Sequence, residues 1–451
     1  MRAPRLDGLL LPEFRSSHPA HGRRERTAAP DALLLNLRGR LAAVMRSGLP
    51  YLLLSMISVQ GLTYASQALV AKVLSPEDFG CIRTVEAVLA TLLVFGSLGM
   101  PTLAVRFAAE TSDEWTRRRL LLRLLAIALT TCLLSAGVVR LVAPSLFPEP
   151  TASYLNILIG VVALTASSRI LQGYALGTNR IRAMSIMTFL LSLVALPALV
   201  GATWWRGTSG WLVGRYGAET LLALGLLFSV WSTLSRRGGP DCGPTAARLM
   251  RLGLPIALSL LLRTGQDAVG LLSLNLLRAP ATLIGHLGLG SLALAVLSVV
   301  PGAVANLALP RMTQRRQVPQ QSRALLLRSV TWGFWLTAPA SAVVLVATPF
   351  LLAKLLPAYT EAGPVLQIMV LIAPCRSVIS MSGSCLLAHL NVGFGLWANG
   401  TALLGALALS LLVGARYGAL GIALVALGVE LATAAAFLLA ARRATRESTA
   451  E

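Results

Sequence analysis

Charged residues are scarce in this chain. Of its 451 residues only 13% are charged and 55% are hydrophobic, whereas a soluble globular protein usually has about a quarter charged. Lysine is almost absent, because Lys72 and Lys354 are the only two. Apolar stretches near twenty residues recur along the whole length, and each is about long enough to cross a bilayer as a helix. The sequence therefore predicts an all-α polytopic membrane protein.

The motifs of several other protein classes are also missing. The five cysteines are scattered without metal-ligand spacing, so we expect neither a metal site nor a disulfide. No P-loop and no catalytic constellation is present, which argues against an ATPase, an enzyme or a cofactor. The formal charge of +21 would suggest nucleic acid in a soluble protein. Here most arginines lie between the apolar stretches, where they orient membrane proteins, and we expect no nucleic-acid partner.

The apolar stretches divide into twelve predicted spans. They cover residues 49–70, 81–104, 120–141, 152–175, 183–204, 211–231, 252–275, 282–308, 324–347, 364–386, 396–413 and 418–440. If the N-terminus is cytoplasmic, the inner segments hold 26 arginines and the outer segments hold eight arginines and lysines. Basic residues favour the cytoplasmic side. We therefore predict that both termini face the cytoplasm and that the chain lies in a bacterial cytoplasmic membrane.

The two halves of the chain resemble each other. "GLP" opens the first and seventh spans, "RLLLR" (119–123) matches "RALLLR" (323–328), and "RYGA" recurs at 215–218 and 416–419. Offsets near 200 residues predict two parallel six-helix lobes around a central cavity. The predicted domains are a basic cytoplasmic tail (1–48), an N-lobe (49–235), a cytoplasmic linker (236–251), a C-lobe (252–440) and a C-terminal tail (441–451).

The segment "LSPEDFG" (74–80) separates the first two spans. Ser75 is a good helix cap, Pro76 suits the first helical position, and the acids Glu77 and Asp78 favour the positive end of a helix. Ser75 and Asp78 also approximate a capping box. We expect a tight elbow here on the outer face. "RAPATLIG" (278–285) takes the matching place in the second half without the acids.

The elbow belongs to a longer segment that resembles a known family. Residues 69–110, "LVAKVLSPEDFGCIRTVEAVLATLLVFGSLGMPTLAVRFAAE", are similar to the N-terminal signature of bacterial polysaccharide-biosynthesis flippases of the multidrug/oligosaccharidyl-lipid/polysaccharide superfamily. This resemblance implies movement of an undecaprenyl-diphosphate-linked oligosaccharide from the inner to the outer leaflet. Its expected partners are the lipid-linked oligosaccharide, the bilayer, and a polysaccharide polymerase and glycosyltransferases.

Polar residues form a stripe on one helix of each predicted lobe. In the first span the stripe is Gln60, Thr63, Tyr64 and Gln67, and in the seventh it is Ser259, Arg263, Gln266, Asp267 and Gly270. A polar stripe is badly placed against lipid. The two stripes are therefore candidate walls of a cavity, with Gln60, Thr63, Tyr64, Gln67 and Gln266 as candidate substrate-binding residues.

Charges at membrane depth mark candidate sites. Arg263 lies about 16 Å into its span by the helical rise, and Arg376 and Glu430 lie at similar depth. Both arginines suit a diphosphate, and Asp267 and Glu430 are candidate orienting or ion-coupling acids. Asp267 follows Arg263 by one turn and could pair with it. Other charged residues lie nearer the membrane surfaces: the pair Arg215 and Glu219, the shallow pair Arg83 and Glu86, and Arg169, which can snorkel.

Several alternatives remain open. The pairs Arg263–Asp267 and Arg376–Glu430 could instead be structural ion pairs that lock the C-lobe without touching a ligand. A cation-coupled drug efflux carrier would use Glu430 or Asp267 as its coupling acid. A membrane enzyme of polysaccharide assembly would need large outer loops or clustered acids, which are missing. The sugar, the energy source and the oligomeric state are not encoded in a readable pattern.

Overall fold

The computed structural model describes residues 49–111, 113–178, 180–234, 243–315, 319–389 and 392–447. Three predicted segments lie wholly or partly outside this range: the tail 1–48, the first part of the linker and the last residues of the C-terminal tail. The described chain is helical, with these elements: α2 Leu49–Val73, α3 Pro76–Ser97, α4 Met100–Glu110, α5 Glu114–Leu146, α6 Thr151–Gly177, α7 Ile181–Leu234, α8 Ala246–Leu276, α9 Ala281–Arg315, α10 Pro319–Leu355, η1 Pro357–Ala362, α11 Gly363–Ala388 and α12 Val392–Glu447.

Two of these helices, α7 and α12, are hairpins. Within the described residues, eight helices are long and apolar enough to cross a membrane, and the two longest reverse direction at a glycine. Gly207 has φ 60° and ψ −136°, and Gly418 has φ 57° and ψ −142°. Glycine adopts positive φ without the steric cost that other residues meet. With α3 and α4 counted as one crossing and each hairpin as two, the helices match the twelve predicted spans.

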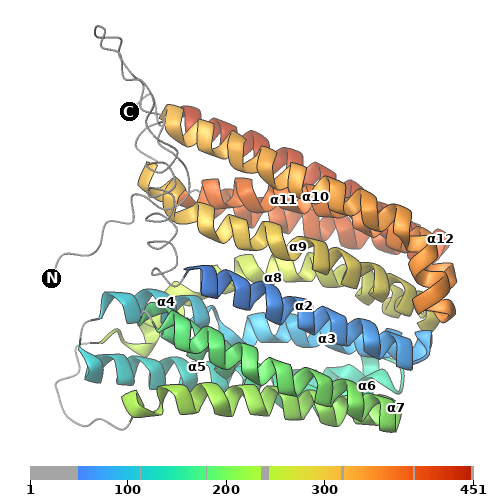
Figure 1. Ribbon diagram of the computed structural model, residues 1–451, viewed down its shortest axis with the longest axis horizontal. Coiled ribbons are helices and arrows are strands. Elements are labelled where there is room, and N and C mark those ends of the chain that lie inside the picture. Colours follow the sequence, from blue (N-terminus) through green and yellow to red (C-terminus); the bar gives the residue numbers. More distant parts are fainter. Residues whose placement is uncertain are drawn as a thin grey trace, which may run out of the picture.

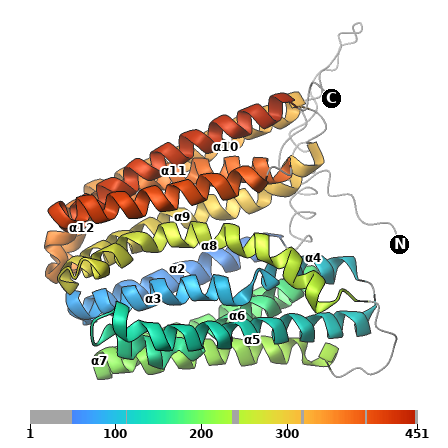
Figure 2. The same cartoon turned by 180° about the vertical axis from the view of Figure 1, so that it is seen from behind.

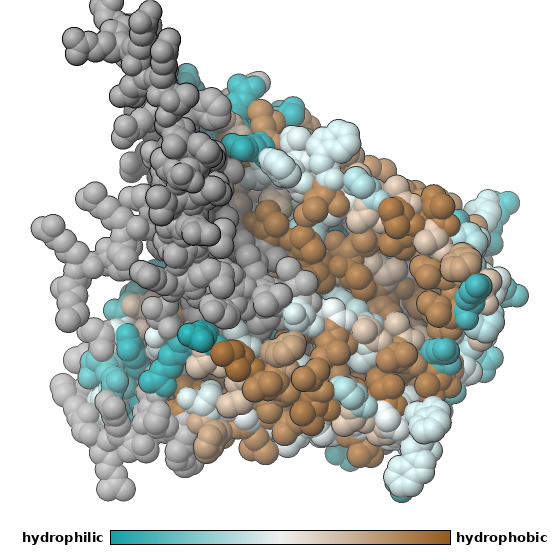
Figure 3. Space-filling view, viewed as in Figure 1, coloured by the Kyte–Doolittle hydropathy of each residue, from teal (hydrophilic) through white to brown (hydrophobic). Residues whose placement is uncertain are grey.

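The helices form two lobes (Figures 1 and 2). Helices α2 to α7 lie on one side and α9 to α12 on the other, with α8 between them and packed against both α12 and α3. The start of α2 and the end of α12 lie at one end of the molecule, named here the terminal end. The α2–α3 turn and both hairpin turns lie at the opposite end, named the elbow end. Apolar side chains cover the middle of the face shown in Figure 3, where a lipid bilayer would lie.

Apolar packing joins the lobes mainly at the elbow end. One buried cluster there combines Val70 and Phe79 of the N-lobe with Leu292, Tyr359 and Val370 of the C-lobe. At the terminal end, the buried cluster of the C-lobe contains residues of α9 to α12 alone. The matching N-lobe cluster reaches the C-lobe side only through the first turns of α8. Because burial of apolar surface holds helices together, the lobes are sealed at the elbow end.

The predicted elbow is confirmed. Ser75 is the N-cap of α3, and its hydroxyl oxygen accepts a hydrogen bond from the Asp78 backbone N–H at 3.1 Å. Pro76 is the first helical residue, and both acids lie in the first turn. The helix thus begins five residues before the predicted span, because the cap and not the hydrophobic run determines its start.

Three details differ from the sequence predictions. The second span is broken between α3 and α4, where Leu98 and Gly99 have φ of 45° and 70°. Helix α8 begins at Ala246, inside the predicted linker, so the second "GLP" lies two turns within the helix. The "RYGA" match is out of register, because Gly418 is the hairpin turn of α12 whereas its match, Gly217, lies well beyond the turn of α7.

Candidate functional site: a charged cavity between the lobes

A cavity of about 420 Å³ lies between the two lobes. Its walls come from α2, α3, α6 and α7 of the N-lobe and from α8, α9, α11 and α12 of the C-lobe. The two predicted polar stripes face it together: the lining includes Gln60, Thr63, Tyr64, Gln67, Gln266 and Asp267. Arg376 and Glu430 also line the cavity, whereas Arg263 does not.

Four charged side chains form a compact cluster on the C-lobe wall. Arg263 donates to both carboxylate oxygens of Glu430, with Nη2–Oε1 at 3.0 Å and Nη1–Oε2 at 3.4 Å. Arg376 donates from Nε to Glu430 Oε1 at 3.1 Å and from Nη2 to Asp267 Oδ1. The cluster contains two arginines and two carboxylates, so its formal charge is zero.

Gln266 ties this cluster to its surroundings. Its side-chain oxygen accepts from Arg263 at 2.9 Å, and its nitrogen donates to the Asn399 carbonyl oxygen at 2.7 Å. Since Asn399 lies on α12, the contact joins α8 to the first arm of the α12 hairpin. Arg263 therefore has all of its visible hydrogen bonds directed into the C-lobe.

The predicted pairing of Arg263 with Asp267 is wrong. Arg263 instead engages Glu430, and Asp267 pairs with Arg376 across to α11. A fork-to-fork contact with a buried carboxylate is stronger than a pair along one helix, and arginine before aspartate is the weaker order for such a pair. The predicted pair Arg376–Glu430 is present.

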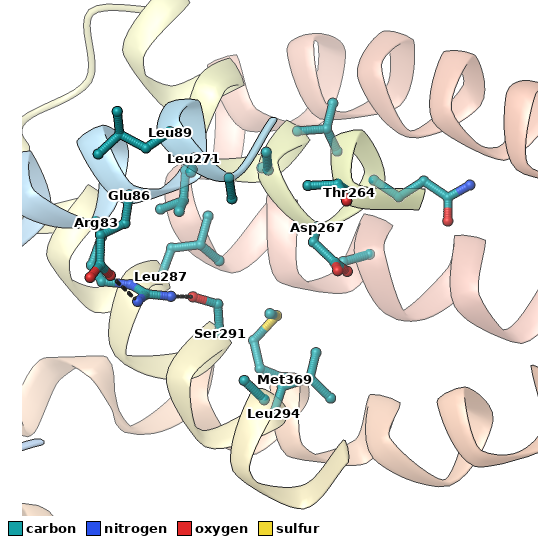
Figure 4. Close-up of a pocket in the computed structure, with 18 of the residues that line it drawn as sticks. Arg83, Glu86, Leu89, Thr264, Asp267, Leu271, Leu287, Ser291, Leu294 and Met369 are labelled. Carbon is teal, nitrogen blue, oxygen red and sulfur yellow. Dashed lines mark hydrogen bonds and ion pairs between the residues drawn. The ribbon is translucent and has the colours of Figure 1, made fainter. Parts of the chain in front are cut away.

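A second network, centred on Arg83, lies on the N-lobe wall. Its Nη1 contacts Glu86 Oε2 at 2.6 Å and Gln67 Oε1 at 3.1 Å, and Gln67 also donates to Glu86. Its Nη2 donates to the Ser291 hydroxyl of α9 at 3.2 Å. Figure 4 shows the Arg83 guanidinium between Glu86 and Ser291. Thr63 is less available, because its hydroxyl donates to the Val59 carbonyl of its own helix.

Arg169 of α6 is the cavity cation without a direct counter-ion. It lines the cavity and is solvent-accessible, and its guanidinium makes no hydrogen bond or ion pair with any residue in the described part of the chain. Glu219 acts on it electrostatically but is itself paired with Arg215 at 3.2 Å. Among the described residues, the cavity lining therefore has one positive charge that no adjacent carboxylate neutralises.

The most informative residues were underrated by sequence reasoning. Arg169 was expected to snorkel, and Arg83 and Glu86 were expected to be shallow, yet all three line the cavity. A signal for Arg169 exists: Thr165, one turn earlier on the same helix face, lines the cavity as well. No comparable signal points to Ser291, which is one of several hydroxyl residues in an otherwise apolar span.

The geometry defines a two-lobed helical membrane protein with a charged central cavity, and known structures share this fold. A lipid II flippase MurJ in an inward closed conformation has a TM-score of 0.68 at 15% identity, covering 88% of this chain and 89% of that one. An inward-facing multidrug resistance MATE family transporter has a TM-score of 0.66 at 11% identity. The match covers 88% of this chain and 99% of that one. An outward-facing MATE family transporter has a TM-score of 0.55 at 13% identity. The match covers 89% of this chain and 96% of that one.

The family comparison agrees with the resemblance found in the sequence. The model of the family described as "Polysaccharide biosynthesis protein" matches residues 46–264. The predicted resemblance to polysaccharide-biosynthesis proteins is thereby confirmed over these residues. No curated protein matches the chain.

Proposed function

We propose that this protein is a flippase that moves a polyprenyl-diphosphate-linked oligosaccharide across a bacterial cytoplasmic membrane by alternating access. The observation that carries the proposal is Arg169, a cavity-lining arginine without a direct counter-ion among the described residues. An unpaired charge in a low-dielectric setting is costly, so such a site favours an anionic ligand. The family match and the shared fold support the substrate class.

Each part of the cavity has a distinct role in this proposal. Arginine holds two phosphate oxygens in a planar fork, so Arg169 is the diphosphate contact. The hydroxyls and amides that line the same cavity suit sugar hydroxyls: Gln60, Tyr64, Thr165, Thr264 and Ser410. The cluster of Arg263, Arg376, Asp267 and Glu430 holds the C-lobe helices together, and Arg376 presents only its exposed edge to the substrate.

The transport direction follows from orientation. The arginine distribution predicts that the terminal end faces the cytoplasm. The lobes are sealed at the elbow end, so in the proposed cycle this conformation receives substrate from the cytoplasmic leaflet. The lobes then rock to open the elbow end and release it outside. A polymerase and glycosyltransferases are the proposed partners that supply and consume this lipid.

Two other functions are less well supported. A cation-coupled efflux carrier would need a cavity carboxylate free to bind its ion. Glu430 accepts hydrogen bonds from two arginines and Asp267 from one, so an incoming cation would have to displace a guanidinium. A membrane enzyme would need clustered acids, and no group of three or more His, Cys, Asp or Glu is found among the described residues.

A complementation experiment tests the proposal. A strain lacking the gene should lose surface polysaccharide while its sensitivity to cationic dyes stays unchanged. Arg169→Gln should fail to restore the polysaccharide at normal protein level, and Arg169→Lys should restore part of it. Arg140→Gln is the matched control, because Arg140 is exposed on α5 and does not line the cavity. Intact polysaccharide with raised dye sensitivity would favour the efflux function instead.

A further inference from the structure

Helices α3 and α9 cross at their first turns with almost no side chain between them. A Cβ atom at Gly80 of α3 would lie 2.3 Å from the Ala281 carbonyl oxygen of α9. A Cβ atom at Gly285 of α9 would lie 2.1 Å from the Pro76 carbonyl oxygen of α3. Both distances are far below a van der Waals contact, so the crossing requires glycine on each side.

This crossing is reciprocal. Pro76 and Ala281 are 205 residues apart, and so are Gly80 and Gly285. Gly80 contacts Ala281. Gly285, the counterpart of Gly80, contacts Pro76, the counterpart of Ala281. Such i-to-j and j-to-i contacts are the mark of a two-fold axis. The approximate axis that relates the lobes passes between α3 and α9 at this crossing.

Arg83 lies next to this axis, at the roof of the cavity. Its counterpart at the same offset is Gly288, and a Cβ there would lie 2.7 Å from Arg83 Cγ. The missing side chain of Gly288 thus makes room for the arginine. Two of the oxygens that Arg83 contacts, those of Glu86 and Ser291, also belong to residues 205 apart. One guanidinium therefore bridges equivalent positions of the two lobes (Figure 4).

Two further contacts cross between the lobes near this point. Asn275 Nδ2 of α8 donates to the Thr84 hydroxyl oxygen of α3 at 2.9 Å, and both residues are buried. The buried ring of Tyr359 packs edge-on against Phe79 at 6.0 Å between centroids. These polar and aromatic contacts surround the backbone crossing, within the apolar cluster that joins the two lobes at the elbow end.

We infer that Arg83, Ser291 and the Gly80–Gly285 crossing form the gate that closes the cavity toward the elbow end. Arg83 keeps its pairing with Glu86 in both states and exchanges the Ser291 hydroxyl for water when the gate opens. This inference rests on the alternating access of the proposed function. It is independent of which substrate is carried.

Cysteine labelling from the elbow side tests the gate. The probe is Ala90→Cys, because Ala90 is exposed in the cavity, in a chain whose five native cysteines are changed to alanine. Ser291→Ala removes a hydrogen bond to a charged group, so labelling by an impermeant maleimide should become about tenfold faster. Gly80→Ala and Gly285→Ala should each have a similar effect, because the added methyl group forces the backbones apart.

Matched controls separate a gate from general loosening. Ser298→Ala removes a hydroxyl that bonds only to Leu294 of its own helix α9, and Gly137→Ala adds a methyl group where nothing lies within 4 Å. Neither should change the labelling rate. Unchanged labelling in Ser291→Ala and in the glycine variants that fold would overturn the gate. A labelling response without any effect of gene loss on surface polysaccharide would instead keep the gate and refute the proposed substrate.

Discussion

The two lobes share a fold but use charge in opposite ways. In the C-lobe, Arg263 and Arg376 are balanced by Asp267 and Glu430 in one closed cluster. In the N-lobe, Arg83 and Arg215 each have a carboxylate partner on their own helix, and Arg169 has none among the described residues. In the proposed function, depth in the membrane does not identify the arginine that binds the ligand. The proposal instead assigns this role to the arginine whose charge is left over after the protein's own ion pairs are formed.

The largest expected effect concerns the C-lobe cluster. Glu430→Gln leaves Arg263 and part of Arg376 buried without their carboxylate, and breaking a buried pair costs roughly 3 kcal/mol of the free energy of unfolding. Arg169→Gln, which breaks no pair, should leave this free energy nearly unchanged. Thermal unfolding of the purified variants in detergent measures both. Equal stability of Glu430→Gln and Arg169→Gln would contradict the conclusion that charge is paired in the C-lobe and left over in the N-lobe.

A double variant sharpens the same test. Replacing both Arg263 and Glu430 with methionine leaves the neutral pair Arg376–Asp267 intact. Because apolar residues of similar volume can replace a buried ion pair with little loss, the double variant should recover most of the stability that Glu430→Gln loses. A double variant as unstable as the single one would indicate that Arg263 has a further role beyond pairing.

A smaller effect is expected where the second helix of the N-lobe is broken. Gly99 has φ +70°, and a Cβ there would lie 2.9 Å from the Gly253 carbonyl oxygen of α8. Gly99→Ala should therefore lower the free energy of unfolding by about 1–2 kcal/mol. The equivalent helix of the C-lobe, α9, is continuous, and Gly302 has nothing within 4 Å. Gly302→Ala should be neutral or slightly stabilising in the same unfolding measurement.

The smallest effect is a dependence on pH at a helix cap. Hydrogen bonds from the Thr116 hydroxyl and backbone N–H hold the pKa of the Asp113 carboxyl below its ordinary value. The charged cap therefore contributes stability above the ordinary pKa, about 4, and loses it as the pH falls through the lower folded-state pKa. The cap of α8 is Thr245, which does not titrate.

Unfolding at two pH values checks this difference. Asp113→Asn should lower the melting temperature slightly at pH 7 and by less at pH 3. Thr245→Ala should have the same effect at both values. If Asp113→Asn lowered the melting temperature equally at both pH values, the amide would fail as a cap because of its geometry and not because it lacks a charge.

Most of the fold was predictable because membrane helices obey simple rules. Long apolar runs gave the spans, and the cap chemistry of Ser75 and Pro76 gave the elbow. The break at Leu98–Gly99 was missed although Gly99 and Pro101 are poor helix formers, because the apolar run continues on both sides of them. The correspondence of the two "RYGA" copies was wrong because Gly418, inside the second copy, makes its hairpin turn, whereas Gly207 makes the turn of the first half before its copy begins.

The site was predictable only in part, for a physical reason. Helical periodicity places polar residues on one face, and the whole first stripe and the last three residues of the second stripe do line the cavity. Periodicity does not tell which helix lies opposite, so the partner of Arg263 was assigned within its own helix instead of to Glu430, 167 residues away. The importance of Arg83 depends on its nearness to the axis between the lobes, which only the packed structure reveals.

The most direct test of the account measures flipping by the purified protein in liposomes. The assay follows a fluorescent polyprenyl-diphosphate-linked sugar, with wild-type protein, Arg169→Gln and the control Arg140→Gln at equal density. The account predicts that Arg169→Gln slows the initial rate about tenfold or more, as expected for loss of a charge-assisted contact, while Arg140→Gln does not. Equal rates for wild-type protein and Arg169→Gln would contradict the claim that the unpaired arginine of the N-lobe carries the diphosphate.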